Sequence, residues 1–143
     1  MEPDKDSNFE LRRSSEIARI WLEEMQACVR AVDYARCGAI VADDVVGFGS
    51  KATMVVGKAA LEEEQWRQVW PNIRNFTFLV DQMHCGSGGV AVVWICCPWA
   101  SERRNAESSW VARPGRMTTV LERRDGVWLA VHTHHSAVPT PHF

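Results

Sequence analysis

The chain has 143 residues, which is enough for one domain with a substantial core and too short for two ordinary domains. Apolar residues make up 46% of the chain and charged residues 24%, a composition typical of a folded globular protein. The 16 basic and 18 acidic residues are scattered and give a net charge of −2, which argues against nucleic-acid binding. No apolar run approaches the length of a membrane span and the N-terminal residues are polar, so we expect a cytoplasmic protein without membrane contact.

The first half of the sequence has helical patterns. Apolar residues recur at helical spacing over 14–32, which predicts a long amphipathic helix. A second, shorter helix is expected over 34–41, followed by a short strand over 45–49. Residues 58–70 are rich in helix formers and stop at Pro71, so they predict a third helix.

The second half has the pattern of a β-sheet, because β-branched and aromatic residues recur in short runs. The expected strands cover 76–84, 90–99, 109–113, 117–123 and 127–135. Turn residues separate them, and Asp125-Gly126 between two strands is a strong hairpin signal. Helices followed by sequential hairpins predict an α+β fold with an antiparallel sheet of four to six strands.

Only the two ends of the chain are expected to lie outside this fold. We predict a flexible N-terminus over 1–13, a single α+β domain over 14–139 and a tail over 140–143.

Metal-binding patterns are weak in this sequence. The five cysteines lack the spacing of a zinc knuckle or a redox pair, and their expected role is that of small buried apolar residues. His132 and His134 supply two imidazoles, whereas zinc needs three or four protein ligands. We therefore predict no metal and no cofactor.

The closing segment carries a family resemblance. Its residues Thr119-Val120-Leu121-Glu122-Arg123-Arg124-Asp125-Gly126-Val127-Trp128 are followed by the strand His132-Thr133-His134-His135-Ser136. This segment resembles the association domain of calcium/calmodulin-dependent protein kinase II, which has an Arg-Arg-Asp-Gly-x-Trp hairpin followed by a His-x-His-x-Ser strand. Over about 17–139, the order of elements resembles the nuclear transport factor 2-like superfamily, particularly its SnoaL-like branch.

The resemblance implies a conical, cystatin-like roll, in which a curved antiparallel sheet wraps around three N-terminal helices. It also implies dimerisation through the sheet, which is common in this superfamily. Members include ketosteroid isomerase, scytalone dehydratase, polyketide cyclases, transport factors and kinase hubs, so the resemblance indicates fold better than function.

Two histidines are candidates for proton transfer. Strict strand alternation places His132 and His134 on one face, together with Trp128, Ala130 and Ser136. If that face looks into the cone, both imidazoles enter a pocket. The alternative is that they hydrogen-bond strand ends and helix caps, or flank a subunit interface.

Asp33 and Arg74 form a second candidate pair. Asp33 follows an apolar stretch and is either a surface residue at a helix end or a buried base. The hexachlorocyclohexane dehydrochlorinase of this superfamily resembles the chain at Ala31-Val32-Asp33 and Val69-Trp70-Pro71, and its Asp-His dyad implies a catalytic role for Asp33. The histidine of that dyad falls at Arg74, which cannot act as a base but can hold a carboxylate or an anionic substrate. A structural ion pair between Asp33 and Arg74, or exposure of both to solvent, is the alternative.

The pocket itself is expected to be apolar. In the kinase association domain the cavity is lined by arginines at positions that match Trp94 and Thr119 here, and both of these residues are uncharged. Such a pocket favours a hydrophobic ligand over a carboxylate or phosphate. A role in the core or in a dimer interface is the alternative for each tryptophan. The predicted ligand-binding residues are Trp70, Val92, Trp94, Cys96, Met117, Thr119, Leu121 and Trp128.

Two hypotheses for function follow. The first is a dimeric domain that binds a small apolar or weakly polar molecule in its interior. Its catalytic version is a cofactor-independent isomerase, dehydratase or hydrolase, in which Asp33 or His134 is the base, His132 orients or donates, and Arg74 is an electrostatic clamp. The second is a non-catalytic oligomerisation or interaction module like the kinase association domain.

Overall fold

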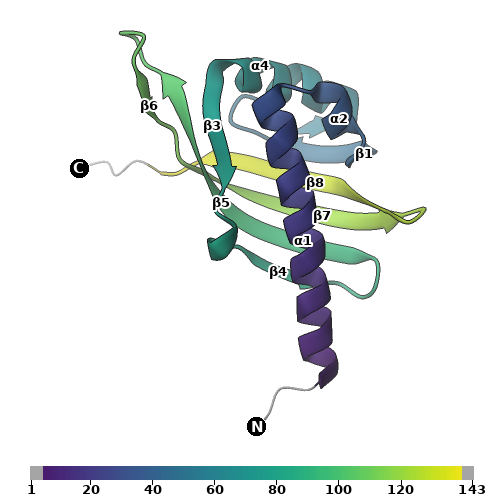
Figure 1. Cartoon of the computed structure of the whole chain (residues 1–143). Coiled ribbons are helices and arrows are strands. Elements are labelled where there is room, and N and C mark those ends of the chain that lie inside the picture. Colours follow the sequence, from purple (N-terminus) through teal and green to yellow (C-terminus); the bar gives the residue numbers. More distant parts are fainter. Residues whose placement is uncertain (1–4, 140–143) are drawn as a thin grey trace.

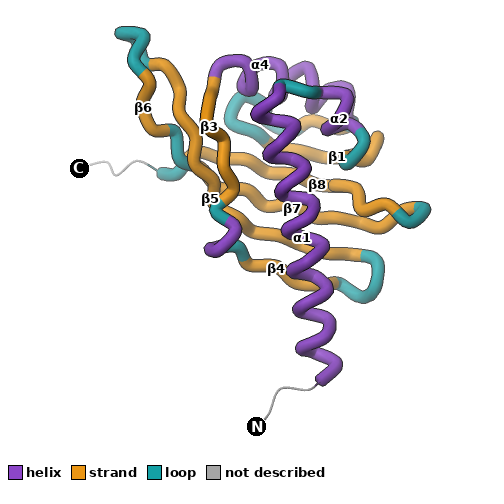
Figure 2. The backbone as a smooth tube through the Cα atoms, viewed as in Figure 1, coloured by secondary structure: helices purple, strands orange, loops and turns teal. Residues whose placement is uncertain are grey.

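A long helix lies across one face of a curved, open β-sheet, as Figures 1 and 2 show. The computed structural model describes residues 5–139. The predicted α+β architecture is confirmed, although the sheet has eight strands in place of four to six. The helices are α1 (Lys5–Ala31), α2 (Tyr34–Gly38), α3 (Lys58–Leu61) and α4 (Arg67–Val69). The strands are β1 (Val41–Phe48), β2 (Val55–Val56), β3 (Ile73–Phe78), β4 (His84–Ser87), β5 (Val92–Arg104), β6 (Trp110–Ala112), β7 (Gly115–Arg124) and β8 (Val127–Ala137).

Helix α1 buries one stripe of its surface against the sheet. The stripe contains Trp21, Leu22, Met25, Cys28 and Val29, all at most 3% exposed and spaced for a single helix face. The helix begins at Lys5 rather than at residue 14, because no glycine or proline interrupts the sequence in between. Residues 1–4 and the predicted tail over 140–143 lie outside the described residues. None of the described helices is long and apolar enough to cross a membrane.

The predicted third helix is broken into several turns. After α3 the chain forms a π-helical turn over Glu62–Trp66, then α4, then a 3₁₀ turn over Trp70–Asn72. Gln65 and Trp66 are consecutive in sequence, yet both are buried. A π-turn has one more residue per turn than an α-helix, so it changes which side chains face the core, and such turns are frequent at functional sites.

Strand β5 is central to the sheet. The order is β2-β1-β8-β7-β5-β3, and the short strands β4 and β6 also pair with β5. β5 extends through residue 104 into a segment without a predicted strand. The predicted strand over 76–84 is divided into β3 and β4 by a 3₁₀ turn at Val80–Gln82.

Two other sequence predictions need correction. The predicted helix over 34–41 ends at Gly38 because Val41 already belongs to β1, which begins before the predicted strand over 45–49. The sheet is mixed rather than wholly antiparallel, because β1 pairs with β8 in parallel.

The two faces of β5 have different surroundings. Val93, Ile95, Cys97 and Trp99 are buried on the inner face, where Ile95 pairs with Thr119 of β7. The intervening side chains point to the outer face, and Trp94 there is 42% exposed. Residues paired in register point to the same side of a sheet, so Met117, Thr119 and Leu121 lie on the inner face. Val92, Trp94 and Cys96 lie on the opposite face, although all six are predicted to line one pocket.

A β-bulge at Val131 changes the orientation of the last strand. Two neighbouring residues of β7, Val120 and Leu121, pair with His132 and Ala130 of β8. Val131, which lies between these two partners, is therefore the extra residue on β8. One inserted residue reverses the alternation beyond it. Ala130 and Thr133 are both buried, and His132 and His134 lie on the outer face with Val120 and Thr118.

The hairpin predicted at Asp125-Gly126 joins β7 to β8. Both residues have positive φ angles, 51° and 78°, which a two-residue type I′ turn requires.

Candidate functional site

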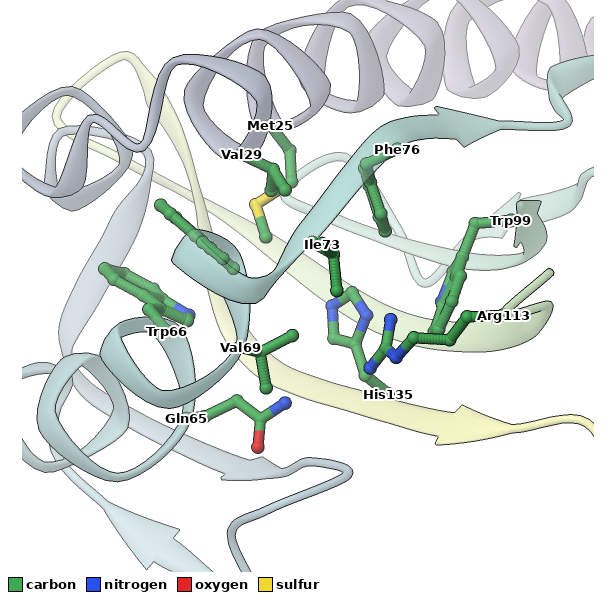
Figure 3. Close-up of a pocket in the computed structure, with 11 residues that line it drawn as sticks. Met25, Val29, Gln65, Trp66, Val69, Ile73, Phe76, Trp99, Arg113 and His135 are labelled. Carbon is green, nitrogen blue, oxygen red and sulfur yellow. The ribbon is translucent and has the colours of Figure 1, made fainter. Parts of the chain in front are cut away.

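An interior cavity lies between the C-terminal half of α1, the broken third helix and the inner face of the sheet (Figure 3). Its volume is about 20 Å³, which is room for about one water molecule. Its walls are mostly apolar, and its polar side chains are Gln65, Arg113 and His135, with the indole nitrogens of the tryptophans. The lining residues are Met25, Val29, Gln65, Trp66, Val69, Trp70, Ile73, Phe76, Trp99, Arg113 and His135.

Three of these residues meet at one corner of the cavity, which we call the polar corner: Trp99, Arg113 and His135. The Arg113 guanidinium carbon lies 4.7 Å from the centre of a Trp99 ring, and the rings of Trp99 and His135 are 6.1 Å apart. Figure 3 shows the guanidinium beside both rings. Trp99 is 1% exposed. Its Nε1 and the buried Nε2 of His135 have no hydrogen-bond partner within residues 5–139.

The environment of the polar corner disfavours additional positive charge. Burial, together with the charge of Arg113, lowers the pKa of His135 to about 3, so this imidazole is neutral at physiological pH. Burial, and then the charge of Arg103, also lowers the pKa of Arg113, although a guanidinium stays charged in water at any physiological pH. The polar corner therefore holds one fixed cation beside one neutral imidazole.

Hydrogen bonds hold the Arg113 side chain in place. Its Nη1 donates to Ser101 Oγ over 3.3 Å and its Nη2 donates to Ser50 Oγ over 3.1 Å. Both partners are neutral hydroxyls. Among the described residues, Arg113 forms no ion pair with a carboxylate.

Gln65 positions the loop that carries Ser50. Its Oε1 accepts hydrogen bonds from the backbone N–H groups of Lys51 and Ala52 over 2.8 and 3.1 Å, and its Nε2 donates to Ser50 Oγ over 3.1 Å. A Cβ at Gly49 would overlap the Gln65 side chain, so the loop needs glycine at this position. The π-turn of the third helix thus reaches Arg113 through Gln65 and Ser50.

A wider cleft continues from the cavity to the surface. It has a volume of about 1100 Å³ and shares Val69, Ile73 and Arg113 with the cavity. Its charged residues are predominantly basic, although the whole chain has a net charge of −2. They are Lys51, Arg103, Arg104 and Arg113, with Glu64 as the acidic member.

Asp33 and Arg74 do not approach the cavity or each other. Asp33 is exposed and caps α2, where its Oδ1 accepts a hydrogen bond from the backbone N–H of Arg36 over 3.0 Å. Arg74 is exposed on β3, where it pairs with Glu102 at 3.2 Å and lies over the Trp110 ring. The structure thus places the two residues of this candidate pair in separate surface environments.

His132 and His134 are also outside the cavity. The Nδ1 of His132 is 2.8 Å from the carbonyl oxygen of Val46 on β1, and His134 is exposed beside Phe48. The bulge at Val131 brings His135 to the inner face in their place. The prediction from strict alternation, that His132 and His134 face inward, is therefore wrong, and the histidine that faces inward is His135.

Of the predicted ligand-binding residues, Trp70 lines the cavity, where it stacks on Trp66 with ring centres 5.1 Å apart. Val92, Trp94 and Cys96 are on the outer face. Trp128 is half-buried near α1, with the Arg13 guanidinium 5.6 Å from its ring. The other three predicted residues are buried in the core on the inner face, outside the cavity lining: Met117, Thr119 and Leu121.

Sequence reasoning missed Arg113, Gln65 and His135 as site residues. Gln65 occupies an apolar position of the predicted third helix, and that mismatch is a usable signal of a buried polar side chain. Arg113 ends a predicted strand and has no distinguishing pattern. Within the described part of the chain, no group of three or more His, Cys, Asp or Glu residues could hold a metal ion.

Comparisons with known proteins address the family and the fold. A family model described as a SnoaL-like domain matches residues 19–141. No curated protein sequence matches the chain. A protein of the nuclear transport factor 2-like fold from Pseudomonas putida KT2440, of unknown function, is 23% identical, with a TM-score of 0.72 over 89% of this chain and 88% of that one.

Two further solved structures are similar to this chain at lower identity. A ketosteroid isomerase-like protein from Erwinia carotovora atroseptica is 16% identical, with a TM-score of 0.73 over 92% of this chain and 98% of that one. The association domain of C. elegans CaMKII is 13% identical, with a TM-score of 0.70 over 90% of this chain and 98% of that one.

Proposed function

We propose, from the premise that this chain belongs to the SnoaL-like domain family, that it binds a small molecule in the cleft at the mouth of its cavity. The observation that carries the proposal is the polar corner, where Trp99 Nε1 and His135 Nε2 are buried without partners beside Arg113. A buried polar group without a hydrogen bond destabilises the folded state by about 1–3 kcal/mol. A bound molecule that pairs with these groups recovers that free energy.

The cleft rather than the cavity accommodates the body of the ligand. The cavity has room for about one water molecule, whereas the cleft has a volume of about 1100 Å³. Val69, Pro71 and Ile73 give the cleft an apolar wall, and Arg113 is the member of the polar corner that lines both the cleft and the cavity. We therefore expect a ligand with an apolar body and at least one polar group, which extends the sequence expectation of an apolar or weakly polar molecule.

We propose binding rather than turnover. With a pKa of about 3, His135 is a hydrogen-bonding group at neutral pH and a poor general base, because efficient bases have a pKa near the working pH. The acid–base roles considered for Asp33, Arg74, His132 and His134 are not supported at this site, since none of these residues lines the cavity or the cleft. His134 lines a separate depression on the outer face, with Cys96 and Arg116.

The test is a comparison of two tryptophan variants. Native and denaturing mass spectra of the purified protein, with a thermal-shift screen of small molecules, identify a ligand whose affinity is then measured by calorimetry. Trp99→Phe removes the indole N–H and keeps an aromatic ring, so we expect affinity to fall about tenfold, the equivalent of one hydrogen bond. Trp94→Phe on the outer face is the matched control and should bind as the parent does. The proposal is wrong if no compound binds, or if Trp94→Phe loses as much affinity as Trp99→Phe.

A second candidate function is assembly through the outer face of the sheet. Trp94 is 42% exposed there, which is unusual for so large an aromatic side chain on a regular strand. Val120 and His132 flank it across β7 and β8. We propose that this face pairs two copies of the chain, a homodimer that is compatible with ligand binding because the cleft opens elsewhere.

A further inference from the structure

We propose that the ligand is an organic acid whose carboxylate pairs with Arg113. This inference rests on the proposed small-molecule function and specifies the substrate class of the same site. It reverses the sequence expectation that the site prefers uncharged ligands, because that expectation considered positions 94 and 119 and not position 113.

The charge of Arg113 has no opposite charge beside it within the described residues. A charge removed from water is strongly destabilising unless an opposite charge or several hydrogen bonds accompany it. Arg113 is half-buried, stacks on Trp99, and has only the hydroxyls of Ser50 and Ser101 as side-chain partners among the described residues. Other arginines that are more exposed, such as Arg67 and Arg74, do have carboxylate partners. The least exposed cation of the site is thus without a carboxylate partner.

Several hydrogen-bond donors of Arg113 and Trp99 remain free. A guanidinium has about five N–H donors, and Arg113 uses its two terminal nitrogens on Ser50 and Ser101 once each. The Trp99 indole adds an unpaired N–H that is fully buried. Both groups only donate, so the ligand atoms that satisfy them must be acceptors. A planar carboxylate, with two acceptor oxygens and a negative charge, fits a planar guanidinium better than a neutral acceptor does.

The charge along the cleft also favours an anionic ligand. Lys51 and Arg103 are exposed on the cleft and, among the described residues, neither forms an ion pair. Basic residues outnumber Glu64 on this cleft, and a predominance of one sign of charge raises the local concentration of ligands of the opposite sign. An anion approaching through the cleft therefore meets these two residues first and Arg113 at the inner end.

The test uses matched pairs of acids and amides that have the same shape and differ in charge. The pairs are acetate and acetamide, hexanoate and hexanamide, benzoate and benzamide, and indole-3-acetate and indole-3-acetamide. Calorimetry with the full chain at pH 7 should show that the acid of at least one pair binds about tenfold or more tightly than its amide, as a charge-assisted contact predicts. The acid's affinity should weaken with added salt, and the amide's affinity should not.

Variants of Arg113 and of the nearby Arg116 show which arginine binds the carboxylate. Arg113→Gln should bring the acid down to the affinity of the amide, and Arg113→Lys should give an intermediate affinity because it keeps the charge and loses the planar fork. Arg116→Gln is the matched control, since Arg116 is exposed on the outer face and donates to Ser136. The melting temperature of ligand-free Arg113→Gln should be no lower than that of the parent, because the variant removes a charge without a counter-charge.

The outcomes separate the two proposals. Amides that bind as tightly as acids, or acids that bind Arg113→Gln as tightly as the parent, would overturn the inference and leave small-molecule binding intact. Binding of inorganic phosphate in competition with the acids, at equal or higher affinity, would also overturn it, because the site would then recognise phosphate rather than an organic carboxylate. If no acid and no amide binds while the Trp99→Phe comparison succeeds with another compound class, only the inference fails.

Discussion

His135 is a histidine whose surroundings oppose its protonation. Its Nε2 is buried, the Trp99 ring lies 6.1 Å away between ring centres, and burial together with the charge of Arg113 lowers its pKa to about 3 from an ordinary value of 6.5. A neutral imidazole has one donor and one acceptor nitrogen, so its Nε2 donates or accepts according to the tautomer, and the ring does not add charge to the polar corner. The single positive charge of Arg113 therefore sets the electrostatic character of the cavity.

This environment predicts a specific dependence of stability on pH. Between about pH 3 and 6.5 the unfolded chain binds a proton at His135 that the folded chain does not bind. The free energy of unfolding should therefore decrease as pH is lowered from 6.5, with a contribution of at most about 1.4 kcal/mol per pH unit, and this contribution should be absent above pH 6.5.

The measurement is urea unfolding of the parent and His135→Phe from pH 4 to pH 8. The difference in stability between the two proteins should shift in favour of the variant as pH falls below 6.5. His84→Gln, which removes an exposed histidine from β4, is the control and should follow the parent. A constant difference between parent and His135→Phe across the whole range would contradict the assigned pKa.

At the scale of elements, the π-turn over Glu62–Trp66 connects the third helix to the site. It buries Gln65, and the Gln65 side chain binds three groups of the 50–52 loop. The same loop supplies the Ser50 hydroxyl to Arg113. The broken helix, the loop and the cation of the site therefore form one hydrogen-bonded unit.

Removal of the Gln65 amide should loosen this unit. Gln65→Leu leaves the N–H groups of Lys51 and Ala52 without their acceptor, and we expect a loss of stability of about 1–3 kcal/mol. Hydrogen exchange at these two amides should accelerate more than exchange elsewhere in the sheet. Gln68→Leu, one turn away and exposed, should change neither quantity. Equal effects of the two substitutions would show that Gln65 does not position the loop.

The β-bulge at Val131 determines which side chains of β8 face the cavity. Without it, His132 and His134 would share the inner face with Ala130, as strict alternation predicted. With it, they face outward, and His135 is the histidine that lines the cavity. One inserted residue therefore decides which imidazole is available to a ligand.

At the scale of the whole molecule, the sheet separates two surfaces with different proposed roles. The inner face is covered by α1 (Figure 1). This face carries the core and the cavity, and the outer face carries Trp94 and the outward-facing histidines. A ligand in the cleft and a second copy on the outer face would therefore occupy opposite sides of the same strands. The two proposed functions can be tested independently.

Trp94→Glu tests the outer face. If the parent is a dimer through this face, a carboxylate in the middle of the interface should dissociate it, because a charge buried without a partner is strongly unfavourable. Light scattering after size exclusion should then give twice the monomer mass for the parent and the monomer mass for the variant, while acid binding at Arg113 is retained. A dimer that survives Trp94→Glu, or a parent that is already monomeric, would exclude assembly through this surface.

The sequence by itself determined the fold class, the long first helix and the Asp125-Gly126 hairpin, and the family resemblance was confirmed by a family model over 19–141. These features depend on local pattern: helical spacing of apolar residues, β-branched runs and turn residues with positive φ. Only the tertiary structure decided the site. The parallel pairing of β1 with β8, the register of β5 on β7, the π-turn and the bulge at Val131 all depend on contacts between distant segments. A change of one residue in register moves every following side chain to the other face, which is why the predicted histidines face outward and Arg113 and His135 meet in the cavity.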